Sequence, residues 1–342
     1  MKILLIMDPG IPVPPPLYGG HERLVYMFAE EYKRLGHEVT LLAGPNSKIS
    51  GQTIVFGINN LKRSKFQKVK ELFSVWKYLF IQRNQFDLIH NFGRLAYLSP
   101  VLNSPVKKIM TYGRSVAQKG IKLVVGLPNK NLIFTACSNF CVSTGNVAGA
   151  WKTVYNAIDF SQYRLVEKFE EHAPLMFLGR LDRVKGLHHA IQVALKSNHT
   201  LLVGGNIPET PDNYKYFKEE IEPLFDGKQI LYLGALNDIE KNKYLGKAKA
   251  LLVPIEWDEP FGMVMVEAMA CGTPVIAFKR GSVPEVIEDG ITGFIVKDKN
   301  DMIDALSKIK NIDRTKCRYT ALKRFDVNVI TNDYLKIAKD DI

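Results

Sequence analysis

The sequence has few cysteines and no long apolar run, and both shortages limit the class of protein. Four cysteines in 342 residues are too few for the disulfide framework of a small secreted domain. No apolar run approaches the roughly 18 residues that a membrane-spanning helix needs. The apolar start at residues 3–7 is too short for a signal peptide and predicts a first strand. We therefore expect four reduced thiols in a cytoplasmic globular protein.

Several well-known site motifs are also missing. There is no G-x-x-x-x-G-K-[ST] loop, which excludes a P-loop NTPase. No G-x-G-x-x-G follows the first strand, which disfavours a dinucleotide-dependent dehydrogenase, and no G-x-S-x-G elbow is present. No cluster of histidine, cysteine and carboxylate residues has the spacing of metal ligands, so we expect no metal.

Acidic residues are scarce in the first half of the chain. Residues 1–158 hold 20 lysines and arginines against 7 acidic residues, a net charge of +13, whereas residues 159–342 hold 26 against 28, a net charge of −2. A basic half indicates a polyanionic partner, such as nucleic acid, an anionic membrane or an acidic small molecule; solvated lysines without a partner are the alternative. Because no RNP, KH or helix-turn-helix pattern occurs, we expect no nucleic acid.

The length and the alternation of short apolar runs with helical segments predict two doubly wound α/β domains. The join is expected in the polar stretch 159–174. In the second half, strands are predicted at residues 175–178, 201–203, 230–233, 250–253, 275–278 and 293–296.

A basic amphipathic helix is predicted between residues 61 and 83. One face carries five apolar residues three or four apart, and basic residues flank it: Phe66, Val69, Phe73, Trp76 and Phe80, with Lys65, Lys68, Lys70, Lys77 and Arg83. The apolar face could pack on the first sheet, with the lysines in water. The helix, taken as residues 62–83, could also dock on an anionic membrane surface. Both can hold, because the apolar face and the basic rim are different residues.

Two cations follow the strand expected at 175–178. Arg180 and Lys185 lie five residues apart, just before a predicted helix. A guanidinium grips phosphate through two hydrogen bonds, an ammonium adds a point charge, and a helix N-terminus adds partial positive charge. This segment predicts a diphosphate site, with a solvated turn as the alternative.

Two glutamates eight residues apart follow the strand expected at 250–253. Glu259 lies in a loop, Phe261-Gly262 should begin a helix, and Glu267 lies within an otherwise apolar stretch of that helix. A carboxylate in such a place needs a partner. Hydroxyl pairs of a sugar or ribose would satisfy both carboxylates, and a salt bridge to a basic neighbour is the alternative for Glu267.

Two glycine-containing turns give weaker indications. Gly19-Gly20 opens the first crossover helix, where backbone can approach a phosphate closely. Gly281–Glu285 is a similar turn into a helix. A simple structural turn is the alternative for each.

Taken together, these segments resemble the retaining glycosyltransferases of family four. The resemblance covers nearly the whole chain and is strongest at residues 259–277, which match the family's E-x7-E motif. Further matches are at 19–23, 34–39, 156–159, 179–186, 281–285 and 289–294. The resemblance implies the GT-B fold: two Rossmann-like doubly wound parallel-sheet domains facing an interdomain cleft. Residues 1–158 would bind the acceptor and 159–324 the nucleotide sugar, with a final helix at about 325–342 crossing back onto the first domain.

The family's roles carry over position by position. The donor diphosphate would be held by Arg180, Lys185, Gly19 and Gly20. The donor sugar would contact Glu259 and the backbone of Phe261, Gly262 and Met263. The ribose would bind Glu267, and the nucleobase would lie near Gly234 and Leu236.

The resemblance also implies the reaction: retaining, metal-independent transfer of a sugar from a UDP- or GDP-sugar, with no cofactor. The acceptor would be a glycan, a lipid-linked molecule or another anionic molecule. The context would be cell-surface glycan, polysaccharide or glycolipid synthesis, in the cytoplasm and at the inner face of the membrane.

One departure from the family concerns catalysis. Tyr112 stands where the family often has a histidine near the sugar, and tyrosine is a poor base near neutral pH. His90 is the nearest alternative in sequence, although a core histidine is the simpler interpretation, and His21 is similarly open. The catalytic candidates are therefore Glu259, Tyr112 and His90. A nucleotide-sugar 2-epimerase and a non-enzymatic basic polyanion-binding protein are the alternative functions.

Overall fold

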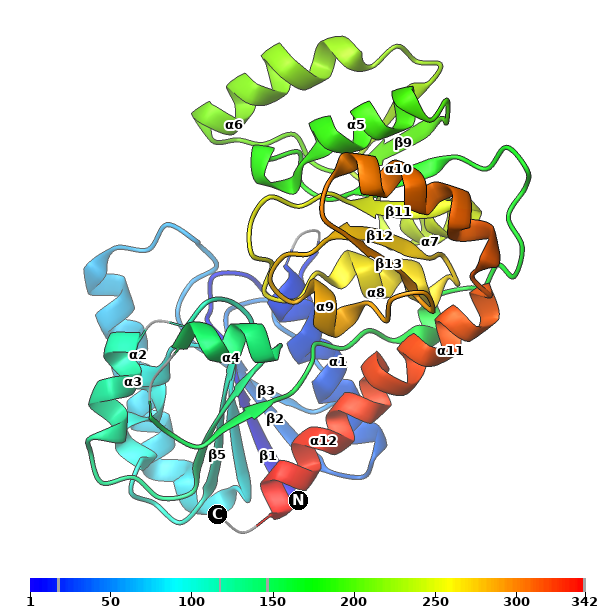
Figure 1. Ribbon diagram of the computed structural model, residues 1–342. Helices are drawn as coiled ribbons and strands as arrows, with labels where there is room; N and C mark the ends of the chain where they lie inside the picture. The colour runs from blue at the N-terminus through cyan, green and yellow to red at the C-terminus, as the bar shows by residue number, and fades with distance from the viewer. Residues whose placement is uncertain (17–18, 117, 146–147, 341–342) are drawn as a thin grey trace. The chain divides into compact units, whose positions relative to one another are not determined.

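The computed structural model describes residues 1–16, 19–116, 118–145 and 148–340 (Figure 1). The chain forms two compact units. One comprises Met1–Ala157 with the C-terminal segment from Val327, and the other comprises Ile158–Asp326. Each unit is built on one parallel sheet with helices on its faces. The prediction of two Rossmann-like parallel-sheet domains is therefore confirmed, and the acceptor and donor roles of the units stay predictions.

The first unit contains a sheet of seven parallel strands in the order β3-β2-β1-β4-β5-β6-β7. Its central strands are buried on both faces, as is usual in parallel sheets; β1 and β6 are mainly apolar, and β4 also buries His90 and Asn91. The strands are β1 (Lys2–Ile6), β2 (Glu38–Ala43), β3 (Gln52–Val55), β4 (Leu88–Asn91), β5 (Lys107–Tyr112), β6 (Leu132–Ala136) and β7 (Trp151–Thr153).

The helices of this unit include one from the far end of the sequence. They are α1 (Gly20–Arg34), α2 (Lys65–Gln82), α3 (Gln118–Val125), α4 (Asn139–Gly145) and α12 (Val327–Lys339), with the short turns η1 (Arg83–Gln85) and η2 (Leu95–Val101). Helix α12 packs against α1 and β5. Its fully buried Tyr334 meets the ring of Phe28 edge to face at 5.3 Å. The core of the first unit is therefore completed by the last helix of the chain.

Helix α2 forms where it was predicted, but the predicted buried face is wrong. The residues of α2 that are buried are Glu71, Val75 and Leu79, whereas the predicted apolar face is largely exposed. Phe66, Phe73 and Phe80 are 78%, 59% and 65% exposed. The helix turns its carboxylate inward because Arg63 and Arg94 lie there to pair with it. The ion pairs of Glu71 therefore determine which face of α2 is buried, and the spacing of the apolar residues alone predicts the opposite face.

The second unit contains six parallel strands in the order β10-β9-β8-β11-β12-β13. They lie where the sequence predicted them: β8 (Leu175–Leu178), β9 (Leu201–Gly204), β10 (Ile230–Gly234), β11 (Ala250–Val253), β12 (Val275–Phe278) and β13 (Gly293–Val296). The helices are α5 (Leu187–Lys196), α6 (Pro211–Tyr216), α7 (Asp238–Lys247), α8 (Met263–Ala270), α9 (Val283–Val286), α10 (Lys299–Lys308) and α11 (Arg314–Phe325). Short helical turns lie at η3 (Phe160–Gln162), η4 (Arg183–Lys185), η5 (Phe217–Ile221), η6 (Glu222–Leu224) and η7 (Ile309–Asn311).

The four cysteines are free and buried, as expected for thiols outside a disulfide framework. Within the described residues, no helix combines the length and apolar character needed to cross a bilayer.

We expect the Tyr334→Ala variant to lose about 3–5 kcal/mol of unfolding free energy, since it removes a large, fully buried aromatic side chain and leaves a cavity. Urea unfolding measures this loss. Lys336→Ala, at an exposed position on the same helix, is the matched control and should stay within about 0.5 kcal/mol of the wild type. Equal midpoints for the two variants would contradict the packing of α12 in the core.

Candidate functional site

The predicted donor residues of the second unit gather at one edge of its sheet. The segments at 179–186, 234–236, 254–262 and 279–282 follow β8, β10, β11 and β12. Since all six strands are parallel, their carboxyl ends share this edge, where open α/β sheets bind ligands. The topology therefore brings together segments more than 70 residues apart.

Lys185 and Glu259, predicted to bind the diphosphate and the sugar, contact each other directly. The Nζ atom of Lys185 lies 2.6 Å from Oε2 of Glu259, and both side chains are mostly buried. The indole Nε1 of Trp257 donates to the same carboxylate oxygen at 2.9 Å, and the ammonium lies 5.1 Å from the centre of the indole ring. Trp257 was not predicted as a site residue. Its position in the loop beside Glu259 was the only indication in the sequence.

Arg180 lies at the surface of the same edge. Its side chain is 54% exposed, and Nη2 lies 2.7 Å from Oδ2 of Asp182. An arginine paired with an acid of its own loop keeps its head group accessible to an incoming anion. Asp182 was not predicted as a site residue, because the phosphate-binding pattern of this segment consists of cations.

The loop that carries Glu259 is held by backbone geometry and by the turn at 281–282. Gly262 has φ +82°, the left-handed conformation that favours glycine, and α8 begins directly after it. The backbone N–H of Ser282 donates to the carbonyl of Glu259 at 2.9 Å, and its hydroxyl donates to the carbonyl of Phe261 at 3.0 Å. Ser282 is fully buried, so the turn at 281–285 supports the Glu259 loop.

Glu267 lies on α8 and is only 8% exposed. Its Oε1 atom lies 3.0 Å from Nζ of Lys241 on α7, and Lys241 also contacts Asp238 at 2.9 Å. Burial lowers the pKa of Lys241, but Glu267 and Asp238 outweigh it and raise that pKa above its ordinary value. The salt-bridge alternative for Glu267 is thus present. The sequence analysis missed Lys241 because it lies 26 residues away, on another helix.

The two residues predicted near the nucleobase lie at the end of β10. Gly234 is half-buried, and its carbonyl accepts from the N–H of Gly205 at 2.8 Å. Leu236 packs against Gly204, whose added Cβ would lie 2.6 Å from the leucine Cδ1. The carboxyl ends of β9 and β10 therefore lie close together beside Leu236.

The first unit has a cavity of about 690 Å³ at the carboxyl ends of β1, β4 and β5. Its lining includes Gly19 and Gly20 at the start of α1, together with His21, Tyr112 and Arg114. The lack of a side chain at Gly113 lets the His21 ring lie close to the backbone there, since an added Cβ would lie 1.7 Å from Nε2 of His21. The structure thus brings the predicted Gly19, Gly20 and Tyr112 around one cavity.

Two titratable groups of this cavity are held in their neutral forms. Burial, with a smaller contribution from Arg114, lowers the pKa of His21 to about 4. Burial raises the pKa of Tyr112 well above its ordinary value. Near neutral pH, both side chains are hydrogen-bonding groups rather than charges.

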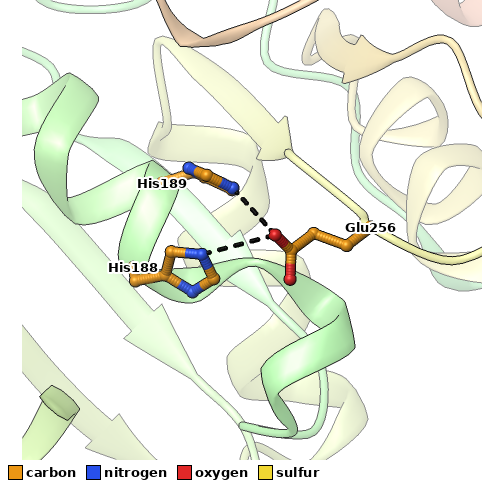
Figure 2. A group of neighbouring side chains, drawn as sticks. All are labelled: His188, His189 and Glu256. Carbon is orange, nitrogen blue, oxygen red and sulfur yellow. Dashed lines mark hydrogen bonds and ion pairs between the residues drawn. The ribbon is translucent and has the colours of Figure 1, made fainter.

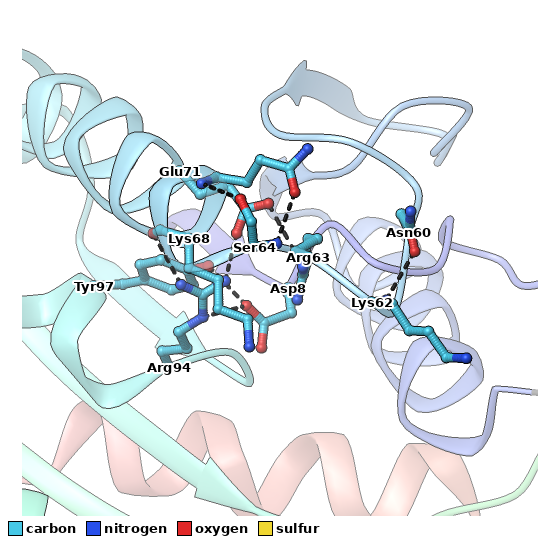
Figure 3. A network of polar contacts seen from close by, with 10 residues as sticks. Asp8, Asn60, Lys62, Arg63, Ser64, Lys68, Glu71, Arg94 and Tyr97 are labelled. Carbon is cyan, nitrogen blue, oxygen red and sulfur yellow. Dashed lines mark hydrogen bonds and ion pairs between the residues drawn. The ribbon is translucent and has the colours of Figure 1, made fainter.

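Asp8, Arg63 and Arg94 also line this cavity and belong to a network of charged side chains (Figure 3). Arg94 pairs with Asp8 at 3.2 Å and with the buried carboxylate of Glu71, which Arg63 also approaches to 3.6 Å. Tyr97 donates to Asp8 at 2.7 Å. Arg63 Nε and Nη1 are buried without a hydrogen-bond partner in the described structure. None of these residues was predicted as a site residue, since they are scattered from 8 to 97.

His90, predicted as a catalytic candidate, lies in the core. Its exposure is 0%, Nε2 lies 2.8 Å from the hydroxyl of Thr111, and Nδ1 lies 3.3 Å from the hydroxyl of Tyr32. Its ring is enclosed by Phe92 and Tyr334. The packing interpretation fits these contacts and the catalytic one does not, because the side chain has no surface from which to reach a substrate.

The fold also assembles a group that the sequence analysis did not identify. His188 and His189 lie at the start of α5, and both face Glu256 in the loop after β11 (Figure 2). Spacing along the sequence gave no indication of this group, since Glu256 lies 67 residues from His189.

A family model matches most of the second unit. Residues 162–324 match the family model described as Glycosyl transferases group 1. A protein of Klebsiella pneumoniae, described as an uncharacterized 41.2 kDa protein in the cps region, is 32% identical over 206 residues, covering 55% of this chain and 54% of that protein. An alpha-maltose-1-phosphate synthase of Mycolicibacterium smegmatis is 31% identical over 129 residues, covering 36% and 33%. The chain thus spans about half, or less, of the length of these curated relatives.

Solved structures resemble the chain over almost its whole length. Sucrose-phosphate synthase from Thermosynechococcus elongatus has a TM-score of 0.78 at 19% identity, with 98% of each chain covered. Anabaena Alr3699/HepE in complex with UDP has a TM-score of 0.73 at 19% identity, covering 98% of this chain and 99% of that one. These neighbours share the fold of two Rossmann-like parallel-sheet units.

We expect the stability of the first unit to fall in mild acid because of its buried histidine. Burial lowers the pKa of His90 from 6.5 to about 3. Between these two values the unfolded chain binds a proton that the folded chain does not, so stability rises with pH. His90 alone should lower the unfolding free energy by about 2 kcal/mol from pH 7 to pH 5.

Urea unfolding at the two pH values measures this difference. The His90→Phe variant, although less stable at pH 7, should lose about 2 kcal/mol less than the wild type on acidification. The same loss in both proteins would show that His90 titrates normally in the folded state.

Proposed function

We propose that the chain is a glycosyltransferase that moves a sugar from a nucleoside-diphosphate sugar to an acceptor. The observation that carries the proposal is the Lys185–Glu259 pair at the strand ends of the unit that matches the group 1 family. There a cation for the diphosphate and a carboxylate for sugar hydroxyls are already in contact. The Anabaena neighbour in complex with UDP supports a nucleotide donor.

Donor binding would exchange ion pairs for ligand contacts. Lys185 would leave Glu259 for a phosphate oxygen, and Arg180 would leave Asp182 in the same way. Glu259, freed from the ammonium, would accept hydrogen bonds from the sugar hydroxyls. Lys185, Arg180 and Glu259 would thus each have a partner both before and after binding, which avoids the cost of leaving these charges unpaired.

The same residues would stabilise the departure of the nucleoside diphosphate. Negative charge develops on the leaving phosphate, where Arg180, Lys185 and the free amides at the start of α8 are placed to stabilise it. We propose that these groups supply the stabilisation without a metal. We propose further that the configuration is retained, with the acceptor attacking on the leaving-group face and the phosphate taking its proton.

The ribose and the acceptor are assigned to two further places. Lys241 would hold the carboxylate of Glu267 in position while the ribose hydroxyls donate to it. The acceptor would bind in the cavity of the first unit, where Arg63, Arg94 and Arg114 favour an anionic group. Tyr112 would donate a hydrogen bond there, since its raised pKa makes it a poor base. The reaction would serve the synthesis of a cell-surface glycan, polysaccharide or glycolipid.

We expect Arg180→Ala and Glu267→Gln each to weaken UDP binding by about 1–3 kcal/mol, roughly 5- to 150-fold, because each loses a charge-assisted contact. Titration calorimetry with UDP and GDP in the presence of EDTA measures the affinity and identifies the base. Lys196→Ala, an exposed cation at the far end of α5, is the control and should bind like the wild type.

Unchanged affinity in both folded variants would contradict the donor site. A new nucleotide sugar formed without any acceptor would indicate a 2-epimerase instead.

We also propose that α2 docks on an anionic membrane surface. Phe66, Phe73 and Phe80 recur every seven residues and form an exposed apolar stripe, which soluble proteins seldom leave in water. Four exposed lysines of the same helix can reach anionic head groups: Lys65, Lys68, Lys70 and Lys77. The stripe would enter the boundary between head groups and acyl chains while the lysines pair with phosphates.

We expect the Phe66→Ser/Phe73→Ser double variant to bind vesicles that contain phosphatidylglycerol at least tenfold more weakly than the wild type, since inserting each phenyl ring contributes about 1.5–3 kcal/mol. Co-sedimentation with these vesicles, and with purely zwitterionic ones, measures the binding. Ile239→Ser, an exposed apolar residue on α7 of the other unit, is the matched control. Equal binding by the wild type and the double variant would contradict docking through α2.

A further inference from the structure

Three potential metal ligands converge on the second unit (Figure 2). The Nε2 atom of His189 lies 3.1 Å from Oε1 of Glu256, and Nε2 of His188 lies 3.6 Å from the same oxygen. The two imidazole rings are 4.1 Å apart. Both histidines therefore present the same ring atom toward one carboxylate.

These spacings suit a tetrahedral ion with nitrogen and oxygen ligands. Zinc binds histidine nitrogen and carboxylate oxygen at about 2.0–2.2 Å, so neighbouring ligands of a tetrahedral site lie roughly 3.3 Å apart. The two measured distances lie on either side of that value. Small side-chain rotations would place an ion among the three atoms.

The surroundings orient His188 for this role. Nδ1 of His188 lies 2.9 Å from the hydroxyl of Tyr216, the kind of contact that fixes the ring of a metal-bound histidine. Nδ1 of His189 is buried and has no hydrogen-bond partner among the described residues, which leaves Nε2 as its interacting atom.

The positive charge next to the cluster is already neutralised. Arg183 forms an ion pair with Glu220, and its guanidinium lies 5.0 Å from the centre of the Tyr216 ring. The side chains of the cluster are partly exposed, so an ion can reach them from solvent.

We propose that His188, His189 and Glu256 form a binding site for one zinc-class transition-metal ion, with water as the fourth ligand. Two imidazoles select zinc-class ions over magnesium and calcium, which prefer oxygen ligands. The site is separate from the proposed glycosyl transfer and does not depend on it.

The ion would join the start of α5 to the loop after β11, and both segments adjoin proposed donor residues. Its histidines begin three residues after Lys185, and Glu256 lies three residues before Glu259. The two loops already touch, since the N–H of Glu256 donates to the carbonyl of Val184 at 2.9 Å. A bound ion would therefore stabilise this pair of loops rather than take part in chemistry.

Titration calorimetry of the EDTA-stripped and dialysed 342-residue chain with zinc chloride tests the proposal. We expect one ion bound per chain in a saturable transition, and no saturable binding of magnesium chloride. His189→Ala and Glu256→Gln should each weaken zinc binding at least tenfold. His172→Ala, at an exposed histidine outside the cluster, should bind zinc like the wild type.

A second measurement separates loss of the site from loss of the fold. Zinc should raise the melting temperature of the wild type and of His172→Ala, but not that of a His188→Ala/His189→Ala variant, whose far-ultraviolet circular dichroism should match the wild type. No saturable zinc binding by the wild type, or unchanged affinity in the double histidine variant, would overturn the site. Because these readouts need no nucleotide, they are independent of the UDP titrations.

Discussion

Every strand of a parallel sheet points the same way, so the loops at the carboxyl ends are forced onto one edge. This constraint organises both units of the chain. In the second unit it gathers Arg180, Lys185 and Glu259 from the ends of β8 and β11. In the first unit it places the start of α1 beside Tyr112 at the end of β5, around one cavity. The proposed chemistry depends on these two carboxyl edges, one in each unit, more than on any single residue.

Buried carboxylates decide how the helices turn around these sheets. Glu71 faces inward on α2 because its carboxylate forms ion pairs with Arg63 and Arg94, and this orientation leaves the aromatic stripe of α2 in solvent. Glu267 faces inward on α8, where its carboxylate forms an ion pair with Lys241. An unpaired buried charge costs several kcal/mol, so the position of the cation outweighs the apolar pattern of the helix. The site and the proposed membrane surface both follow from such pairs.

The two clusters of the second unit differ in how they could be found. Arg180, Lys185 and Glu259 lie in short segments whose residue types already indicate phosphate and sugar binding, so sequence inspection identifies them. The cluster of His188, His189 and Glu256 follows no familiar ligand spacing, because adjacent histidines on a helix do not ordinarily share a face. They converge only because the loop after β11 carries Glu256 to the first turn of α5.

The sequence by itself determined the first strand, the six strands of the second unit, the presence of two sheets and the loops that carry the donor motifs. Those features depend on apolar runs and turn residues, which act over a few neighbours along the chain. Only the tertiary structure decided which face of α2 is buried, that His90 is enclosed in the core, and that Lys241 meets Glu267. Each of these depends on partners brought from distant strands and helices. The free energy of burying a charge or a ring depends on those partners, and the spacing of residues along one helix or strand does not reveal them.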